Sequence, residues 1–134
     1  PPLLVAHHAS FGEASGDVHA SVHARWVEGD AEVHRGVAKF PELARRGLAA
    51  LRAKDLNAFA DCIDQNLEAR QALWPVPEAD LELAARARKA GAAAKLCGSG
   101  GALVIVPRPG VQLQSLASDL SHDGWALFEP ELPG

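Results

Sequence analysis

Residues 93–106 read AAKLCGSGGALVIV, and this stretch decides how the chain is expected to fold. Two short apolar runs, residues 93–97 and 102–106, read as strands. Between them stand three glycines in four positions, which give the backbone the freedom that a turn needs. The stretch therefore predicts two strands joined by a glycine-rich turn.

The flanking sequence extends this pair of strands into a sheet. Apolar runs at residues 3–7 and 125–128 predict one strand near each end. Apolar side chains at helical spacing predict helices over residues 18–26, 33–51, 56–73, 78–90 and 113–120. The order is that of an α+β, ferredoxin-like split β-α-β sheet of about four mainly antiparallel strands, with an enlarged, multi-helix first crossover. Helices should cover one face of this sheet.

Several single residues carry expectations of their own. Pro41 lies inside the 33–51 stripe, which keeps its phase, so a kinked helix or two helices meeting near Phe40 are expected. Asp17 can serve as an N-cap, with the helix opening at Val18. Gly91 should cap the end of the helix over 78–90. The tryptophans follow the apolar stripes and are expected in the core: Trp26, Trp74 and Trp125.

Composition bounds the class of protein. The 134 residues, 48% of them hydrophobic and 22% charged, predict one globular domain over residues 1–134. A net charge of -4 argues against a general affinity for nucleic acid. The apolar runs are too short to cross a bilayer, and no signal peptide is visible. Cys62 and Cys97 are expected to be reduced thiols in a cytoplasmic protein.

The glycine-rich turn, Gly98-Ser99-Gly100-Gly101, is the strongest chemical signal. Successive N–H groups in such a turn can hold anionic oxygens in one concavity, and Ser99 adds a hydroxyl donor. A Walker-type loop and a dinucleotide fingerprint are both excluded, because each needs a helix directly after its glycines. A tight hairpin with convenient glycines is the alternative, and spacing alone does not decide between this and ligand contact.

Residues 94–104, AKLCGSGGALV, resemble the third, C-terminal glycine-rich motif of the GHMP kinases (galactose, homoserine, mevalonate and phosphomevalonate kinases). The usual form is Lys-Leu-Thr-Gly-Ala/Ser-Gly-Gly-Gly, from which the sequence departs with Cys97 at the Thr position and Ala102 at the last Gly. Five further segments resemble the glucuronokinase-like sugar kinases in the same order: PPLL at 1–4, SGDVH at 15–19, RWVEGD at 25–30, NLEAR at 66–70 and GAAAK at 91–95.

The resemblance implies the C-terminal, substrate-side half of an ATP-dependent sugar kinase. The implied reaction phosphorylates the anomeric hydroxyl of a uronic acid such as glucuronate. ATP and Mg²⁺ would be held mainly by an N-terminal half, the expected partner, whose Pro-x-x-x-Gly-Leu-Gly-Ser-Ser motif this sequence lacks. No catalytic residue is therefore expected in this chain, which alone should be inactive and should show an exposed apolar side.

The resemblance also implies which residues form the site. The glycine-rich turn and Lys95 would lie beside the phosphates and the substrate. Arg70 suits a uronate carboxylate, because its planar fork makes bidentate contacts. Asn66 stands four residues before it, on the same helix face. The full set of expected sugar contacts is Ser15, Gly16, Asp17, His19, Asn66 and Arg70.

Other readings stay open. The acceptor can instead be of the heptose, fucose or mevalonate type, or the chain can be a stand-alone ferredoxin-like ligand-binding or regulatory module without catalysis. Asn66 and Arg70 can be a solvated helix face. His19 and His23 have a spacing that can bind zinc, yet no metal site is expected, because neither a His-Glu-x-x-His pattern nor a cysteine cluster accompanies them. Cys97 has no evident His or Asp partner for nucleophilic catalysis.

Overall fold

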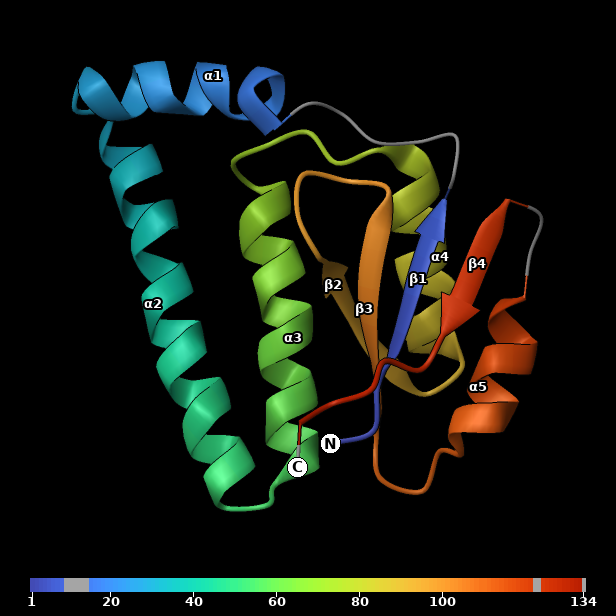
Figure 1. The fold of residues 1–134 in the computed structure, drawn as a ribbon. Coiled ribbons are helices and arrows are strands. Elements are labelled where there is room, and N and C mark those ends of the chain that lie inside the picture. The colour runs from blue at the N-terminus through green and yellow to red at the C-terminus, as the bar shows by residue number, and fades with distance from the viewer. Residues whose placement is uncertain (9–14, 122–123, 134) are drawn as a thin grey trace.

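The computed structural model describes residues 1–8, 15–121 and 124–133, with the side chains of residues 15–18 left outside the description. Within these ranges the strands and helices follow one another in the predicted order (Figure 1). The elements are β1 (Leu4–His8), α1 (Ser15–Val27), α2 (Ala31–Arg52), α3 (Leu56–Gln71), α4 (Glu78–Lys89), β2 (Ala92–Leu96), β3 (Ala102–Pro107), α5 (Leu113–Leu120) and β4 (Trp125–Phe128).

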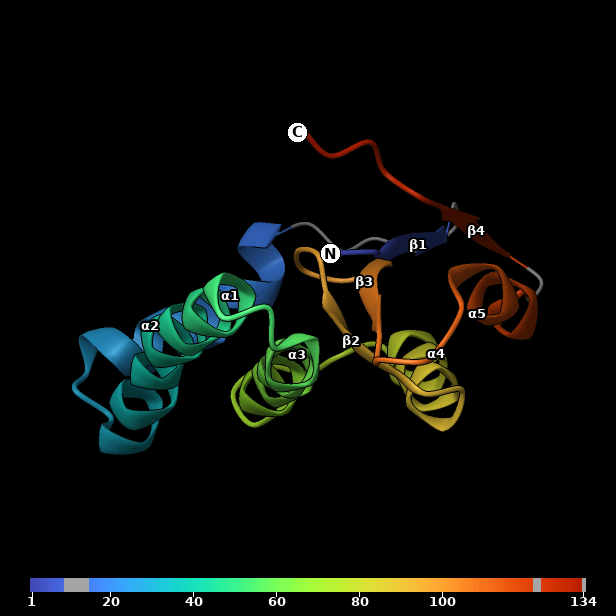
Figure 2. The ribbon, with the colours of Figure 1, turned by 90° about the horizontal axis from the view of Figure 1, so that it is seen from below.

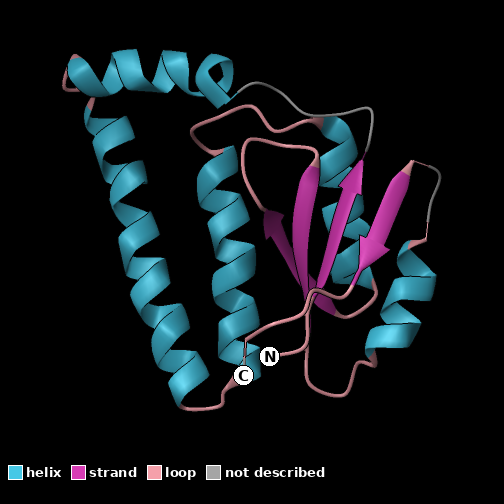
Figure 3. Cartoon of the chain, in the orientation of Figure 1, coloured by secondary structure: helices cyan, strands magenta, loops and turns pink. Residues whose placement is uncertain are grey.

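The strands form one sheet in the order β2-β3-β1-β4, and every neighbouring pair is antiparallel. This is the ferredoxin-like order, with β1 between β3 and β4. The first crossover contains α1 to α4, whereas the second contains α5 alone (Figure 3). The predicted α+β fold with an enlarged first crossover is therefore confirmed.

The sheet has one face turned to the main core. One row of cross-strand partners lies in or against that core: Leu96, Leu103, Ala6 and Leu127. Helices α4 and α5 lie on this side, and α3 runs beside β2 (Figure 2). Because side chains alternate along a strand, the next row faces the other way: Lys95, Val104, Val5 and Phe128. Lys95 therefore projects from the face opposite the core.

The caps of the long helices follow from local sequence. The Asp30 side chain caps α2 by accepting hydrogen bonds from the backbone N–H groups of Glu32 (3.0 Å) and Val33 (3.4 Å). Asp55 caps α3 in the same way, accepting from the N–H of Ala58 at 2.9 Å. Pro41 lies within α2, which is one continuous helix, so the alternative of two helices meeting near Phe40 is wrong. Gly91 ends α4 with φ of +89°, as expected of a C-terminal cap.

A second, smaller core joins the α1–α2 corner to the end of α3. Its buried members are Val22 of α1, Val33 of α2 and Leu73, which follows α3. Phe40 and Trp74 pack against it while staying partly exposed. This cluster holds α1 across the end of α2, close to the glycine-rich turn (Figure 1).

Two expectations about α1 are wrong. The helix begins at Ser15, so Asp17 lies inside its first turn and is not the N-cap. Trp26 is 41% exposed rather than buried in the core, because its ring stacks on His34 at the outer corner, with centroids 3.8 Å apart. Trp125 does pack against the main core. In the described part of the chain, no helix has the length and apolar character needed to span a membrane.

Candidate functional site

A pocket of about 300 Å³ lies where the glycine-rich turn meets the ends of α1 and α3. It brings together six of the residues that sequence predicted for the site: His19, Asn66, Arg70, Lys95, Gly98 and Ser99. The remaining lining residues are Phe40, Trp74, Leu96 and Cys97. Residues from four separate parts of the sequence therefore meet around one cavity.

Arg70 has an unusual environment in this pocket. Its Nε and one Nη atom are buried and have no hydrogen-bond partner among the described residues. The guanidinium lies over the ring of Trp74, with Cζ 5.2 Å from the ring centroid. Burial lowers the pKa of Arg70 from its ordinary value. A buried cationic donor without an acceptor is costly, so this arrangement fits a site that receives an anion.

Lys95 is the second cation of the pocket. Its Nζ donates to the backbone carbonyl of Leu96 at 2.7 Å. Burial lowers the pKa of Lys95, the Cys97 thiol acts against this, and the charge of Arg70 lowers it further. No carboxylate lines the pocket among the residues that the structure describes. Two partly buried cations that repel each other, with no carboxylate beside them among the described lining residues, make a local field that favours anions.

Cys97 is not activated for nucleophilic chemistry. Burial raises the pKa of its thiol, and the positive charge of Lys95 only opposes this effect. The thiol is thus mainly protonated at neutral pH, the less reactive form. Both cysteines are free in the structure, with Cys62 buried and Cys97 exposed.

The glycine-rich turn is fixed at its base. Cys97 N–H donates to the carbonyl of Ala102 at 2.9 Å, which closes the hairpin. Gly101 donates its N–H to Asp80 Oδ2 at 2.9 Å, and its carbonyl accepts from His8 N–H at 2.9 Å. The Gly101 amide therefore faces the protein rather than an anion in the pocket. Gly98 and Ser99 line the pocket, whereas Gly100 and Gly101 do not.

Two neighbours of the site were not predicted from sequence. Trp74 packs against the smaller core, as predicted, but it also forms a wall of the pocket and packs against Arg70, which was not predicted. Asp80, in the first turn of α4, is only 1% exposed and accepts a hydrogen bond from the N–H of Gly101 in the glycine-rich turn. The available signal for Asp80 was an acidic residue at a helix start shortly before the motif, which by itself indicates only a favourable helix terminus.

The remaining predicted residues lie at the start of α1. Ser15, Gly16 and Asp17 form its first turn, but their side chains lie outside the described residues. His19, one turn later, reaches the pocket with its ring edge-on to Trp74, centroids 5.3 Å apart. Within the described ranges, no group of three or more His, Cys, Asp and Glu side chains could hold a metal ion.

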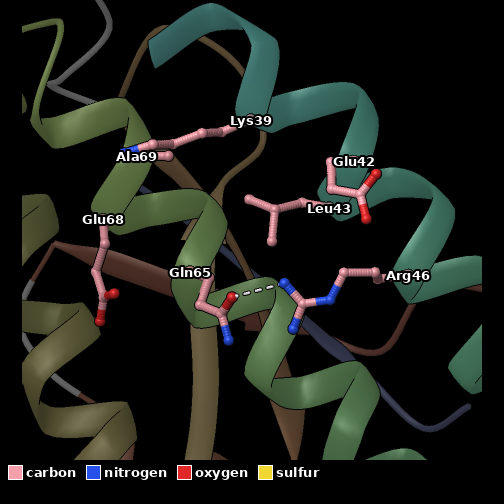
Figure 4. A pocket seen from close by; sticks show the side chains of 7 residues that line it. All are labelled: Lys39, Glu42, Leu43, Arg46, Gln65, Glu68 and Ala69. Carbon is pink, nitrogen blue, oxygen red and sulfur yellow. Dashed lines mark hydrogen bonds between the residues drawn. The ribbon is translucent and has the colours of Figure 1, made fainter. Parts of the chain in front are cut away.

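Two other hollows differ from this pocket. A groove of about 380 Å³ between α2 and α3 carries both signs of charge, with Arg46 bonded to Gln65 at 3.1 Å (Figure 4). An apolar groove of about 430 Å³ adjoins the pocket and shares Phe40, Asn66 and Lys95 with it. Its apolar lining includes Leu48, Leu51, Phe59, Ile63 and Val104. We call this hollow the apolar groove; it agrees with the expected apolar side.

Comparison with known proteins gives two kinds of likeness, although no protein-family model matches the chain. The chain is 33% identical to "Probable glucuronokinase 2" and 30% identical to "Glucuronokinase 1", both of Arabidopsis thaliana, over 97% and 95% of its length. It spans only 36% of each of these relatives. Its fold matches that of L. major mevalonate kinase, solved in complex with R-mevalonate, with a TM-score of 0.79 and 19% identity over 89% of this chain and 37% of that one.

The sequence likeness covers nearly the whole chain, and the fold likeness covers the same region. The motif of the glycine-rich turn, the ferredoxin-like strand order and the two comparisons agree on one assignment. The chain is similar in sequence to these glucuronokinases and shares its fold with mevalonate kinase, which supports its resemblance to the C-terminal domain of the GHMP kinases.

Proposed function

We propose that this chain is the substrate-side domain of an ATP-dependent sugar kinase that phosphorylates the anomeric hydroxyl of a uronic acid such as glucuronate. The observation that carries the proposal is the pair of cations, Arg70 and Lys95, in a pocket beside the glycine-rich turn that no carboxylate lines among the described residues. The names of the two plant relatives point to the same substrate class.

Arg70 is the residue best suited to the carboxylate of the acceptor. Its planar fork can donate two parallel hydrogen bonds, and Trp74 holds the guanidinium in place from one side. Asn66, one helical turn away, offers an amide that can both donate to and accept from sugar hydroxyls. A uronic acid would therefore neutralise the pocket and satisfy the buried Arg70 donors that have no partner among the described residues.

Lys95 and the turn residues Gly98 and Ser99 suit the phosphoryl side of the reaction. Phosphoryl transfer depends mainly on positioning and on stabilising negative charge, and these residues supply a cation and a hydroxyl at one edge of the pocket. Mg²⁺ would neutralise phosphate charge in such a transfer. The described residues of this pocket include no carboxylate suited to ligate Mg²⁺, so that ion fits a site on the N-terminal half.

The proposed partner is an N-terminal kinase half that holds ATP. The chain spans about a third of its plant relatives, which leaves room for such a half in proteins of that length. The apolar groove borders the pocket, so a partner that covers it would also close the site. Burial of this apolar surface would stabilise the two halves against each other.

The test is an acceptor panel with the full natural polypeptide and Mg-ATP. Glucuronate should be phosphorylated with a kcat/KM about 10²-fold above that of glucose, because glucose lacks the carboxylate that Arg70 binds. Arg70→Ala should lower the kcat/KM for glucuronate to about that for glucose. Arg45→Ala is the matched control, since Arg45 is exposed and pairs with Glu42 at 2.7 Å away from the pocket.

Mevalonate belongs in the same panel, because it also carries a carboxylate. Turnover of mevalonate in preference to glucuronate would replace the proposed acceptor while keeping the role of Arg70. Equal turnover of glucose and glucuronate by the unmodified protein would refute the role of Arg70. Absence of phosphorylation with every acceptor would refute the kinase function.

A further inference from the structure

Asp80 lies in the first turn of α4 and is buried, with only 1% of its surface exposed. Its Oδ2 accepts the N–H of Gly101 at 2.9 Å, a contact that spans 21 residues of sequence. A carboxylate is expensive to bury, and it persists in a fold when its hydrogen bonds repay that cost. The contact therefore calls for an explanation in terms of the glycine-rich turn that it holds.

The turn is shaped around this carboxylate. Gly100 has φ of +146°, a conformation that other L residues rarely adopt. A side chain at Gly100 would meet Pro77 Cγ at 3.1 Å and Asp80 Oδ2 at 3.2 Å. Pro77 and Asp80 together form the surface on which the turn rests. The positive φ of Gly100 and Gly101 lets the backbone contact that surface and then turn into β3.

Gly101 is held on both sides of its backbone. Its N–H is bound by Asp80, and its carbonyl accepts from the N–H of His8 at the end of β1. Gly98 and Ser99, at the other side of the turn, line the pocket with Lys95 and Arg70. The fixed base thus determines where the pocket-facing part of the turn lies.

We propose that Asp80 is a positioning residue that holds the glycine-rich turn in the conformation that completes the pocket. The hydrogen bond that Asp80 Oδ2 accepts at 2.9 Å fixes the direction of the Gly101 N–H. Asp80 also lies in the first turn of α4, where the helix dipole favours negative charge. The turn, by this proposal, is pre-organised by the protein before any ligand binds.

The catalytic consequence rests on the proposed kinase function, whereas the conformational consequence does not. If the turn lies beside the transferred phosphoryl group, loosening it should lower kcat more than it changes the KM for glucuronate, because Arg70 and Asn66 are untouched. Loss of positioning of this kind costs on the order of 10²-fold in rate. A general loss of stability would instead lower the amount of folded enzyme without such a split.

The experiment compares Asp80→Ala and Asp80→Asn with a matched control, Asp64→Asn, in the full polypeptide. Asp64 also accepts a backbone N–H of β2, that of Ala94 at 3.0 Å, but it lies outside the pocket and pairs with Arg88 and Arg108. Amide hydrogen exchange over residues 97–103 reports the turn directly. Steady-state kinetics at a temperature where all variants are folded report kcat and KM.

The expected result for Asp80→Ala is faster exchange at Gly101 and a kcat lower by about 10²-fold, with the KM for glucuronate changed by less than about 3-fold. Asp80→Asn keeps an acceptor oxygen and should recover part of both effects. Asp64→Asn should leave kcat per folded molecule unchanged. If Asp80→Ala does not fold, Asp80→Asn carries the same comparison.

Unchanged exchange at Gly101 in the Asp80 variants would overturn the proposal. So would a kcat loss that Asp64→Asn reproduces, because the effect would then follow from stability alone. An unmodified protein without kinase turnover would refute the proposed function. It would not refute the positioning of the glycine-rich turn by Asp80, which hydrogen exchange tests without any substrate.

Discussion

Arg70 and Arg108 are both partly buried arginines near α3, yet they lie in opposite electrostatic surroundings. Arg108 donates to Asn57 at 2.8 Å and pairs with Asp61 at 2.7 Å and with Asp64 at 3.1 Å. The hydrogen bond to Asp61 is the main cause that raises the pKa of Arg108. Arg70 has two buried nitrogens that find no partner in the described ranges, and burial lowers its pKa.

The difference teaches how the same side chain serves two purposes in one domain. At Arg108 the fold supplies the anions, so the guanidinium ties the end of β3 to α3. At Arg70 the described fold supplies no anion, so the guanidinium is a cost to the free domain that a ligand can offset. Variants at the Arg108 site should therefore change the stability of the fold, whereas variants at the Arg70 site should change the response to a ligand.

The largest effect on stability is expected for Asp64→Ala. This change removes the acceptor of Arg88 at 3.0 Å, of Arg108 at 3.1 Å and of the Ala94 N–H at 3.0 Å. We expect a loss of about 2–3 kcal/mol in the free energy of unfolding, reduced from the value for a fully buried pair because both arginines are partly exposed. Urea denaturation measures it. A loss below about 0.5 kcal/mol would show that the network contributes nothing to the fold.

A smaller effect of the opposite sign is expected for Arg70→Leu. The substitution removes a desolvated cation that has no hydrogen-bond partner in the part of the chain that the structure describes, and it keeps an apolar contact with Trp74. The free energy of unfolding should therefore rise, by no more than about 1 kcal/mol. Arg108→Leu is the control and should lower the same quantity by roughly 1–2 kcal/mol. Equal losses of unfolding free energy in both variants would show that Arg70, like Arg108, stabilises the fold.

The smallest effect concerns pH and Lys95. Because its pKa is lowered, Lys95 loses its proton at a lower pH than an ordinary lysine of pKa 10.5. A bound anion favours the protonated form, so affinity for a uronate should weaken as pH rises through the alkaline range below 10.5, and binding there should take up protons. Calorimetry in buffers of different ionisation enthalpy measures this uptake. Lys95→Arg should flatten the pH profile; a slope that survives this change would exclude Lys95 as its source.

Sequence predicted the elements that depend on local signals. The apolar runs of β2 and β3 and the glycines between them gave the hairpin, and the spacing of Asn66 and Arg70 placed both on one face of α3, where they line the same pocket. The family resemblance singled out this face and the glycine-rich turn together. These are properties of neighbours in the chain, which periodicity and motif can detect.

The features that sequence did not predict depend on contacts between distant segments. Asp80 meets Gly101 across 21 residues, and Arg108 meets Asn57 across 51. Nothing local distinguishes Asp80 from an ordinary acidic residue in the first turn of a helix. Trp26 was assigned to the core because it follows an apolar stripe, but the stripe ends at an outer corner where His34 is its stacking partner.

The packing of Trp74 against Arg70 has an optical consequence. The chain contains three tryptophans and no tyrosine, so its near-ultraviolet absorption and emission come almost wholly from indole rings. Trp26 lies at the outer corner and Trp125 against the main core, whereas Trp74 lines the pocket. With Trp26 and Trp125 replaced by phenylalanine, the emission of Trp74 alone would report the charge above its ring, and the domain would carry its own fluorescent indicator of an arriving anion.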